Sequence, residues 1–159
     1  MALPPDFTTF RTCYQHPAGA IGVALSRWLI DAEYAHLLPA QPGTPDARGA
    51  IPALGTYRLT PGGLEALSAH GVDCTALRID APYQACADYT VRLADGRRGV
   101  PHVGSRLGAA LTRWLLNARY AERQPHAITV YGRRTLQLTA AGRQRLGDLR
   151  VGLSVAVPG

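Results

Sequence analysis

Two pairs of cysteine and histidine are the residues in this chain of 159 amino acids that are best suited to chemistry. Cys13 lies three positions before His16, Cys86 lies sixteen positions before His102, and Asp88 follows Cys86. Thiolate, imidazole and carboxylate groups are the ligands that zinc and similar ions take in proteins. The chain has no Cys-x-x-Cys spacing, however, and free cysteine commonly packs as a small apolar residue. We therefore expect structural roles for these five residues, with a zinc-like site as the alternative and no resident cofactor.

The sequence holds no recognisable catalytic constellation. There is no Gly-rich phosphate loop after a strand and no Gly-x-Ser-x-Gly turn, and the acidic residues are few and scattered. We therefore expect that the protein is not an enzyme. A histidine ahead of a helix, as at His16 and His102, is expected to cap the helix or to bond the backbone. Cys74 has no repeat counterpart and is expected only to pack in the core.

The composition indicates a soluble protein of the cytoplasm. No run approaches the roughly 18 apolar residues of a membrane span, so no membrane partner is expected. The first residues, MALPPDFTTFR, lack the basic and then apolar order of a secretory signal. Three irregularly spaced cysteines are too few for a disulfide framework.

The basic residues are all arginine and are distributed unevenly. Residues 1–85 hold five Arg against seven acidic residues, net −2, whereas residues 86–159 hold twelve Arg against four, net +8. A GC-rich coding bias explains the missing lysine but not the asymmetry, which suggests that one half faces a polyanion. Six arginines cluster in the basic half: Arg106, Arg113, Arg119, Arg123, Arg133 and Arg134. We predict that they contact double-stranded DNA, with a solvated surface as the alternative.

An internal repeat carries these residues. GVALSRWLIDAEYA, residues 22–35, returns as GAALTRWLLNARYA, residues 108–121, and ten of twenty positions are identical between residues 16–35 and 102–121. A second echo pairs TYRLTPGGLEAL with TLQLTAAGRQRL. The chain is therefore interpreted as a duplication of one unit.

Each unit is predicted to be a helix, a two-stranded wing and a second helix. Apolar residues recur with helical spacing from Ser105 onward. In the second copy, residues 127–139 are expected to form a hairpin around Gly132, with Arg133 and Arg134 near its tip. In the first copy, the connection over residues 37–55 is rich in Pro and Gly and is expected to be a long loop.

The second helix of each unit has clear end signals. Thr60 and Thr139 stand where an N-cap belongs, Pro61 suits the first helical turn, and Gly71 suits the helix end. The predicted fold class is α+β, with two tandem winged-helix-like repeats, residues 1–80 and 81–159, related by internal pseudo-symmetry. Trp28 and Trp114, at equivalent positions, are expected to pack in a core that the copies share.

The ordered motifs resemble a family of bacterial regulators. LTPGGLEAL and LTAAGRQRL are similar to the segment that follows the wing in winged-helix regulators. RTCYQHPAGAIGVAL, and Cys86, Asp88 and His102 ahead of GSRLGAAL, resemble the C-terminal region of arsenical-resistance-repressor (ArsR) type regulators. About ten residues precede the motif, so the N-terminal helix-turn-helix domain of that family is expected to be missing. The resemblance implies a winged-helix fold and a role in transcription regulation.

We therefore predict a transcription-regulator-like module that binds DNA through its second unit. The alternative is a dimerisation, ligand-sensing or metal-sensing module that does not itself bind DNA. The apolar tail RVGLSVAVPG, residues 150–159, has no evident place in its own unit and is expected to pair with a second chain in a homodimer.

Overall fold

Four helices and a series of short antiparallel strand pairs make up the part of the chain that the structure, a computed structural model, describes. The described residues are 9–39, 55–92, 96, 99–124, 134–153 and 157–158. Their elements, in chain order, are β1 (Arg11–Cys13), β2 (His16–Ala18), α2 (Gly19–Asp31), β3 (Ala35–Leu38), β4 (Thr56–Leu59), α3 (Pro61–Ala69), β5 (Tyr83–Asp88), β6 (Val91–Arg92), β7 (Val100–Val103), α4 (Ser105–Asn117), β8 (Ala121–Arg123), β9 (Leu136–Leu138), α6 (Ala140–Asp148) and β10 (Val157–Pro158). The chain is α+β, as expected. No described helix has the length and apolar character that crossing a membrane requires.

The same order of elements occurs twice. A hairpin, β1–β2 and later β5–β7, leads directly into a helix of 13 residues, α2 and later α4. A second hairpin, β3–β4 and later β8–β9, leads into a helix of 9 residues, α3 and later α6. Each half therefore contains the predicted succession of helix, two strands and helix, and begins with a hairpin that the sequence analysis did not predict.

The two nine-residue helices are capped as predicted. Thr60 Oγ1 accepts a hydrogen bond from the Gly63 amide at 2.9 Å, and Thr139 Oγ1 accepts one from the Gly142 amide at 3.0 Å. Each threonine hydroxyl also donates to a carbonyl just after the preceding long helix. The cap therefore fastens the start of each short helix to the end of the long helix of the same half.

The spacing LT-x-x-G in both halves has a steric cause. A Cβ atom on Gly63 would collide with the carbonyl of Tyr34, and one on Gly142 would collide with the carbonyl of Tyr120. The short helix therefore approaches the backbone of the preceding turn so closely that only glycine fits there.

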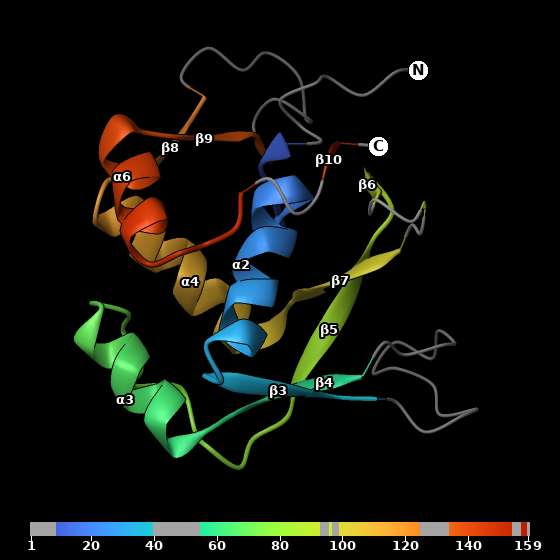
Figure 1. Ribbon diagram of the computed structural model, residues 1–159, viewed down its shortest axis with the longest axis vertical. Helices are drawn as coiled ribbons and strands as arrows, with labels where there is room; N and C mark the ends of the chain where they lie inside the picture. The colour runs from blue at the N-terminus through green and yellow to red at the C-terminus, as the bar shows by residue number, and fades with distance from the viewer. Residues whose placement is uncertain are drawn as a thin grey trace.

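The long helices α2 and α4 pack against one another in the centre of the molecule (Figure 1). The rings of Trp28 and Trp114 stack with centroids 6.4 Å apart and planes 14° apart, and both side chains are buried. Each ring also meets a tyrosine of its own half edge-on, Tyr34 at 5.4 Å and Tyr120 at 5.7 Å. The prediction of a tryptophan pair in a shared core is confirmed, and one core cluster contains residues of both halves.

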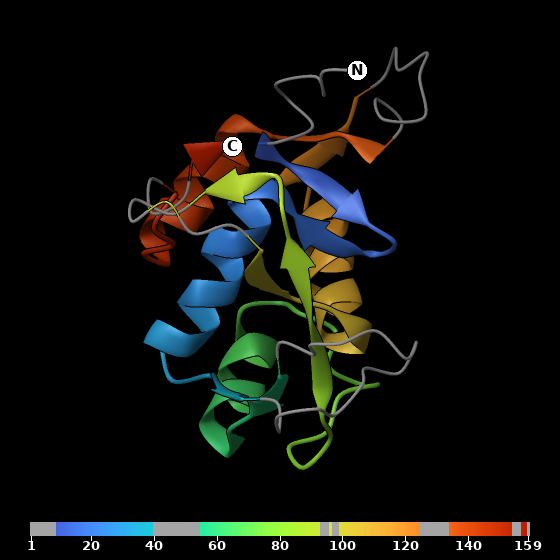
Figure 2. The same cartoon turned by 90° about the vertical axis from the view of Figure 1, so that its right-hand side faces the viewer.

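Strand pairing also joins the halves. β4 of the first half pairs with β5 of the second, with Tyr57 opposite Tyr83. In the other direction, Arg11 at the start of β1 forms a bridge with Thr135, just before β9, and the Leu136 amide donates to the Phe10 carbonyl at 3.0 Å. Each half thus extends a sheet of the other half (Figures 1 and 2).

The hairpin of the second half does not form where it was predicted. β9 pairs with β8, which places Glu122 opposite Gln137. The reason is local: the amide of Tyr120 closes the end of α4 on the Leu115 carbonyl, so the chain is already extended at Ala121. Residues 125–133, with Gly132 and Arg133, and most of the long loop of the first copy lie outside the described residues.

The C-terminal tail has a place within its own chain, contrary to the prediction. Val157 and Pro158 pair antiparallel with Arg92 and Val91 of β6. This pairing is not predictable from the sequence because β6, a strand of two residues, has no recognisable pattern. Pairing of Val157 and Pro158 within the chain therefore gives no support to a homodimer formed through the tail.

Candidate metal centre

The first hairpin of each half places a cysteine directly opposite a histidine. Cys13 is opposite His16 in β1–β2, and Cys86 is opposite His102 in β5–β7. Side chains at directly opposite positions of an antiparallel pair lie on the same face of the sheet. The two pairs therefore have the same register, although different lengths of chain separate their members.

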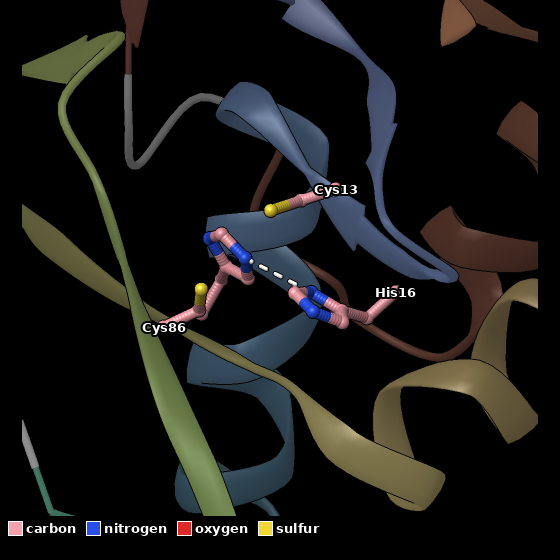
Figure 3. A group of neighbouring side chains, drawn as sticks. Cys13, His16 and Cys86 are labelled. Atoms are coloured by element: carbon pink, nitrogen blue, oxygen red, sulfur yellow. Dashed lines mark hydrogen bonds between the residues drawn. The ribbon is translucent and has the colours of Figure 1, made fainter. Parts of the chain in front are cut away.

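The two hairpins face one another and bring the four side chains together. One candidate ligand atom from each of Cys13, His16, Cys86 and His102 lies within 4.8 Å of all the others. The imidazoles contact each other through His102 Nε2 and His16 Nδ1, which are 3.1 Å apart. Figure 3 shows Cys13, His16 and Cys86 directed toward a common centre between the hairpins. The sequence predicted each residue as a candidate, and the structure collects them at one point.

The separations match the needs of a tetrahedral ion. Metal bonds of about 2.0 Å to nitrogen and 2.3 Å to sulfur require nitrogens roughly 3.3 Å apart and sulfurs roughly 3.8 Å apart. The two imidazole nitrogens, 3.1 Å apart, are close to this separation, and all four donor atoms lie within 4.8 Å of one another. Both histidines are buried, whereas both cysteines are partly exposed. The donor set, two thiols and two imidazoles, is one that zinc takes.

Asp88 was a candidate metal ligand, but its carboxylate does not converge with the four donor atoms. It follows Cys86 by two residues on β5, which carries its carboxylate about 7 Å farther along the same face. There it lies behind His102, with Oδ2 3.5 Å from the imidazole Nδ1. This contact falls short of hydrogen-bond geometry, and the described residues offer Nδ1, a fully buried atom, no other partner.

The Asp88 carboxylate is fully buried and is held by both halves of the chain. Its Oδ2 accepts a hydrogen bond from the Gly19 amide at 2.7 Å, at the first residue of α2. Its Oδ1 lies 3.3 Å from Arg11 Nη2 and also accepts from Thr90. The carboxylate therefore joins the hairpin of the first half to the start of α2 and lies beside Nδ1 of His102. Arg11, two residues before Cys13, was not among the predicted site residues.

Neighbouring groups shift the pKa values of Asp88, His102 and Cys13. Burial raises the pKa of Asp88, but His102, Thr90 and Arg11 outweigh it and hold the pKa well below its usual range. Burial likewise opposes protonation of His102, but Asp88 and Cys13 outweigh it and raise the pKa of His102. The hydrogen bond with Cys86, aided by His102, lowers the pKa of Cys13 to about 4 despite its partial burial. A thiolate is the form of cysteine that binds metal.

Neither histidine caps a helix by its side chain, so the capping part of the expectation is wrong. The residues at the N-caps of α2 and α4 are Ala18 and Gly104, and neither helix start has a side-chain cap bond. Each histidine lies three residues before the first residue of the following helix, and the two rings face each other. Cys74 lies outside the cluster and packs against the core, with its thiol 3.4 Å from the Val72 carbonyl.

The predicted DNA-contacting arginines occupy different surroundings. Arg106, Arg113, Arg119 and Arg123 are exposed on α4, on the turn after it and on β8. Arg134 is half-buried, and its Nε donates to the Thr12 carbonyl at 3.1 Å. Arg133 lies outside the described residues.

Comparison of this chain with protein-family models, with curated proteins and with solved structures finds no match.

Proposed function

We propose that the protein is a non-enzymatic metal-sensing module of two tandem winged-helix-like repeats. A zinc-like ion would be held between the repeats by Cys13, His16, Cys86 and His102. The observation that carries the proposal is the convergence of four donor atoms, two from each repeat, within 4.8 Å of one another. Simple packing of small apolar residues does not account for a cluster that joins two buried imidazoles to two thiols.

Asp88 supports a metal more than it supports a purely structural role. A histidine that binds metal through one nitrogen commonly directs its other nitrogen at a carboxylate, which fixes the tautomer and makes the ring a stronger ligand. His102 has this arrangement, with Nδ1 toward Asp88 and Nε2 toward the centre. Binding would release protons, because the ion replaces those that the thiols and imidazoles share.

A sensing role fits better than a role in folding. Small structural zinc domains need the ion because they lack a sufficient core. This chain has a continuous core with the stacked pair Trp28 and Trp114 at its centre, and that core does not involve the four donors. The ion would therefore adjust how the two hairpins meet rather than create the fold, as an exchangeable signal requires.

Chelator competition tests the proposal. The metal-free protein is titrated with zinc in the presence of a chromogenic chelator, for the wild type and for Cys13→Ala, Cys86→Ala and Cys74→Ala. We expect one ion per chain. Each of the first two variants should lose more than about 100-fold in zinc affinity, because loss of a residue that only hydrogen-bonds to a metal ligand typically costs about 10- to 100-fold. Cys74→Ala, the matched control, should keep wild-type affinity. Equal affinities for all four proteins would refute the proposal.

DNA contact by the second half is a second candidate function. It is supported by the net charge of +8 over residues 86–159 and by the exposure of Arg113, Arg119 and Arg123. α4 is buried around most of its circumference and has few exposed residues, so contact with phosphates fits better than insertion of the helix into the major groove.

Salt dependence tests this second candidate. Binding of generic duplex DNA should weaken with salt by a log–log slope of about −0.9 per phosphate contact. Changing Arg119 and Arg123 together to Gln should make that slope shallower by up to about two units. Absence of salt-dependent binding by the wild type would leave only the sensing role.

A further inference from the structure

A cleft of about 730 Å³ lies on one side of the candidate metal centre. His16 and Cys86 both line it, so a molecule in the cleft would lie against the centre itself. The side chains around them include the uncharged polar residues Gln15, Gln84 and Ser105. Arg106 is the only permanently charged residue among the described residues that line the cleft, so the cleft favours an anion.

The surroundings of Asp88 show how this fold holds a buried carboxylate beside one of the two histidines. Asp88 lies two residues after Cys86, touches the first residue of α2, pairs with Arg11 and faces the outer nitrogen of His102. Three groups of different kinds, an amide, a guanidinium and an imidazole, thus surround one buried carboxylate.

Around the cleft, groups from both halves surround the side chain that takes the place of Asp88, and this side chain is not a carboxylate. Gln15, two residues after Cys13, takes the sequence place of Asp88 and lines the cleft. Ser105 is the first residue of α4, as Gly19 is of α2, and it lines the cleft beside Arg106. The Nε2 side of His16 lies next to Gly104, another lining residue.

We propose that this cleft binds a small molecule bearing a carboxylate, which pairs with the Arg106 guanidinium and lies against His16. Arginine suits this task because its planar fork can donate two parallel hydrogen bonds to one carboxylate. The bound carboxylate would face Nε2 of His16, as the Asp88 carboxylate faces Nδ1 of His102. Binding itself does not require the metal; only its effect on the metal rests on the proposed function.

A coupling between ligand and metal follows. A carboxylate beside a metal-bound imidazole strengthens that ligand, so the small molecule should tighten zinc binding. By reciprocity, zinc should tighten carboxylate binding by the same factor. The module would then respond to two signals together.

Succinate is the probe for the test, with the neutral succinamide as its match. Amide NMR spectra of the metal-free and the zinc-loaded protein are followed during titration to about 50 mM. We expect saturable shifts at Gln15, Gln84, Ser105 and Arg106 with succinate and not with succinamide. Arg106→Gln should weaken binding by about tenfold or more, as loss of a charge-assisted pair predicts. Arg113→Gln, on the same helix and exposed but outside the cleft lining, should bind as the wild type does.

The outcomes separate the two proposals. Absence of saturable shifts in both forms, equal binding by Arg106→Gln, or equal binding of succinamide would overturn the cleft proposal. Arg106-dependent binding to the metal-free protein supports it, even if zinc titration finds no metal site. Arg106-dependent binding only to the zinc-loaded protein would overturn the proposal that the cleft by itself binds the carboxylate.

Discussion

His102 Nε2 lies 3.1 Å from His16 Nδ1, although the two residues are 86 positions apart in the chain. They hold equivalent places in the two repeats, each opposite a cysteine in the hairpin that precedes a long helix. One repeat alone offers a single Cys–His pair, which is too few ligands for a tetrahedral ion. Duplication followed by face-to-face packing of the hairpins supplies four. This relationship is the basis of the functional account.

Asp88 should act on the metal through His102. Changing Asp88 to Asn removes the charge behind the imidazole and should lower zinc affinity by about 10- to 100-fold, as outer partners of metal ligands usually do. Chelator competition measures the affinity, and far-UV circular dichroism verifies that the variant is folded. The control is Asp73→Asn, an exposed carboxylate that accepts hydrogen bonds from the nearby Thr75. Wild-type affinity in Asp88→Asn would show that the carboxylate does not assist the site.

Asp88 should also govern how the metal-free protein responds to acid. Despite the effect of its burial, His102, Thr90 and Arg11 hold the pKa of Asp88 below its usual value of about 3.9. A depressed pKa contributes stability that is present above that usual value and is lost as pH falls toward the folded-state pKa.

Urea unfolding at a series of pH values measures this contribution. Between about pH 5 and pH 2, the wild-type free energy of unfolding should fall more steeply than that of Asp88→Asn, which has no carboxylate to protonate. Parallel curves for the two proteins over this range would contradict the assignment of a stabilising buried carboxylate.

The glycines of the two LT-x-x-G motifs should be equally intolerant of a side chain. Gly63→Ala and Gly142→Ala each place a methyl group against a backbone carbonyl that has little room to move. Each substitution should cost about 1–3 kcal/mol of stability, the range for overpacking. Gly62→Ala is the matched control, because a Cβ there meets no atom within 4 Å and alanine favours a helix.

Thermal or urea unfolding of the three variants provides the comparison. We expect Gly62→Ala to be neutral or slightly more stable than the wild type. If Gly63→Ala and Gly142→Ala were equally well tolerated, the close approach of each short helix to the preceding turn would be wrong.

The sequence predicted those parts of the fold that local patterns encode. The long helices follow from apolar spacing, and the caps at Thr60 and Thr139 follow from side-chain chemistry that acts within one helical turn. The stacking of Trp28 on Trp114 was predictable because equivalent apolar positions in a duplication tend to meet at the interface of the copies.

The candidate site was harder to predict because register, not spacing, creates it. Cys13 and His16 flank a two-residue turn, whereas a long insertion that contains β6 separates Cys86 from His102. Both pairs nevertheless have the same cross-strand register, which no comparison of sequence spacings reveals. The strands β1 and β2 have three residues each, too few to show an alternating pattern. The pairing of the tail with β6 was missed for the same reason.

The electronic spectrum of the cobalt(II)-loaded protein tests the central claim most directly, because cobalt replaces zinc in such sites and reports its own ligands. For the wild type and for Cys74→Ala, we predict one cobalt ion per chain, intense visible d–d bands of a tetrahedral centre, and near-ultraviolet charge transfer from two thiolates. Cys13→Ala or Cys86→Ala should lose about half of the charge-transfer intensity, and the double variant should lose all of it. A wild-type spectrum of octahedral cobalt without thiolate charge transfer would contradict a metal centre shared by the two hairpins.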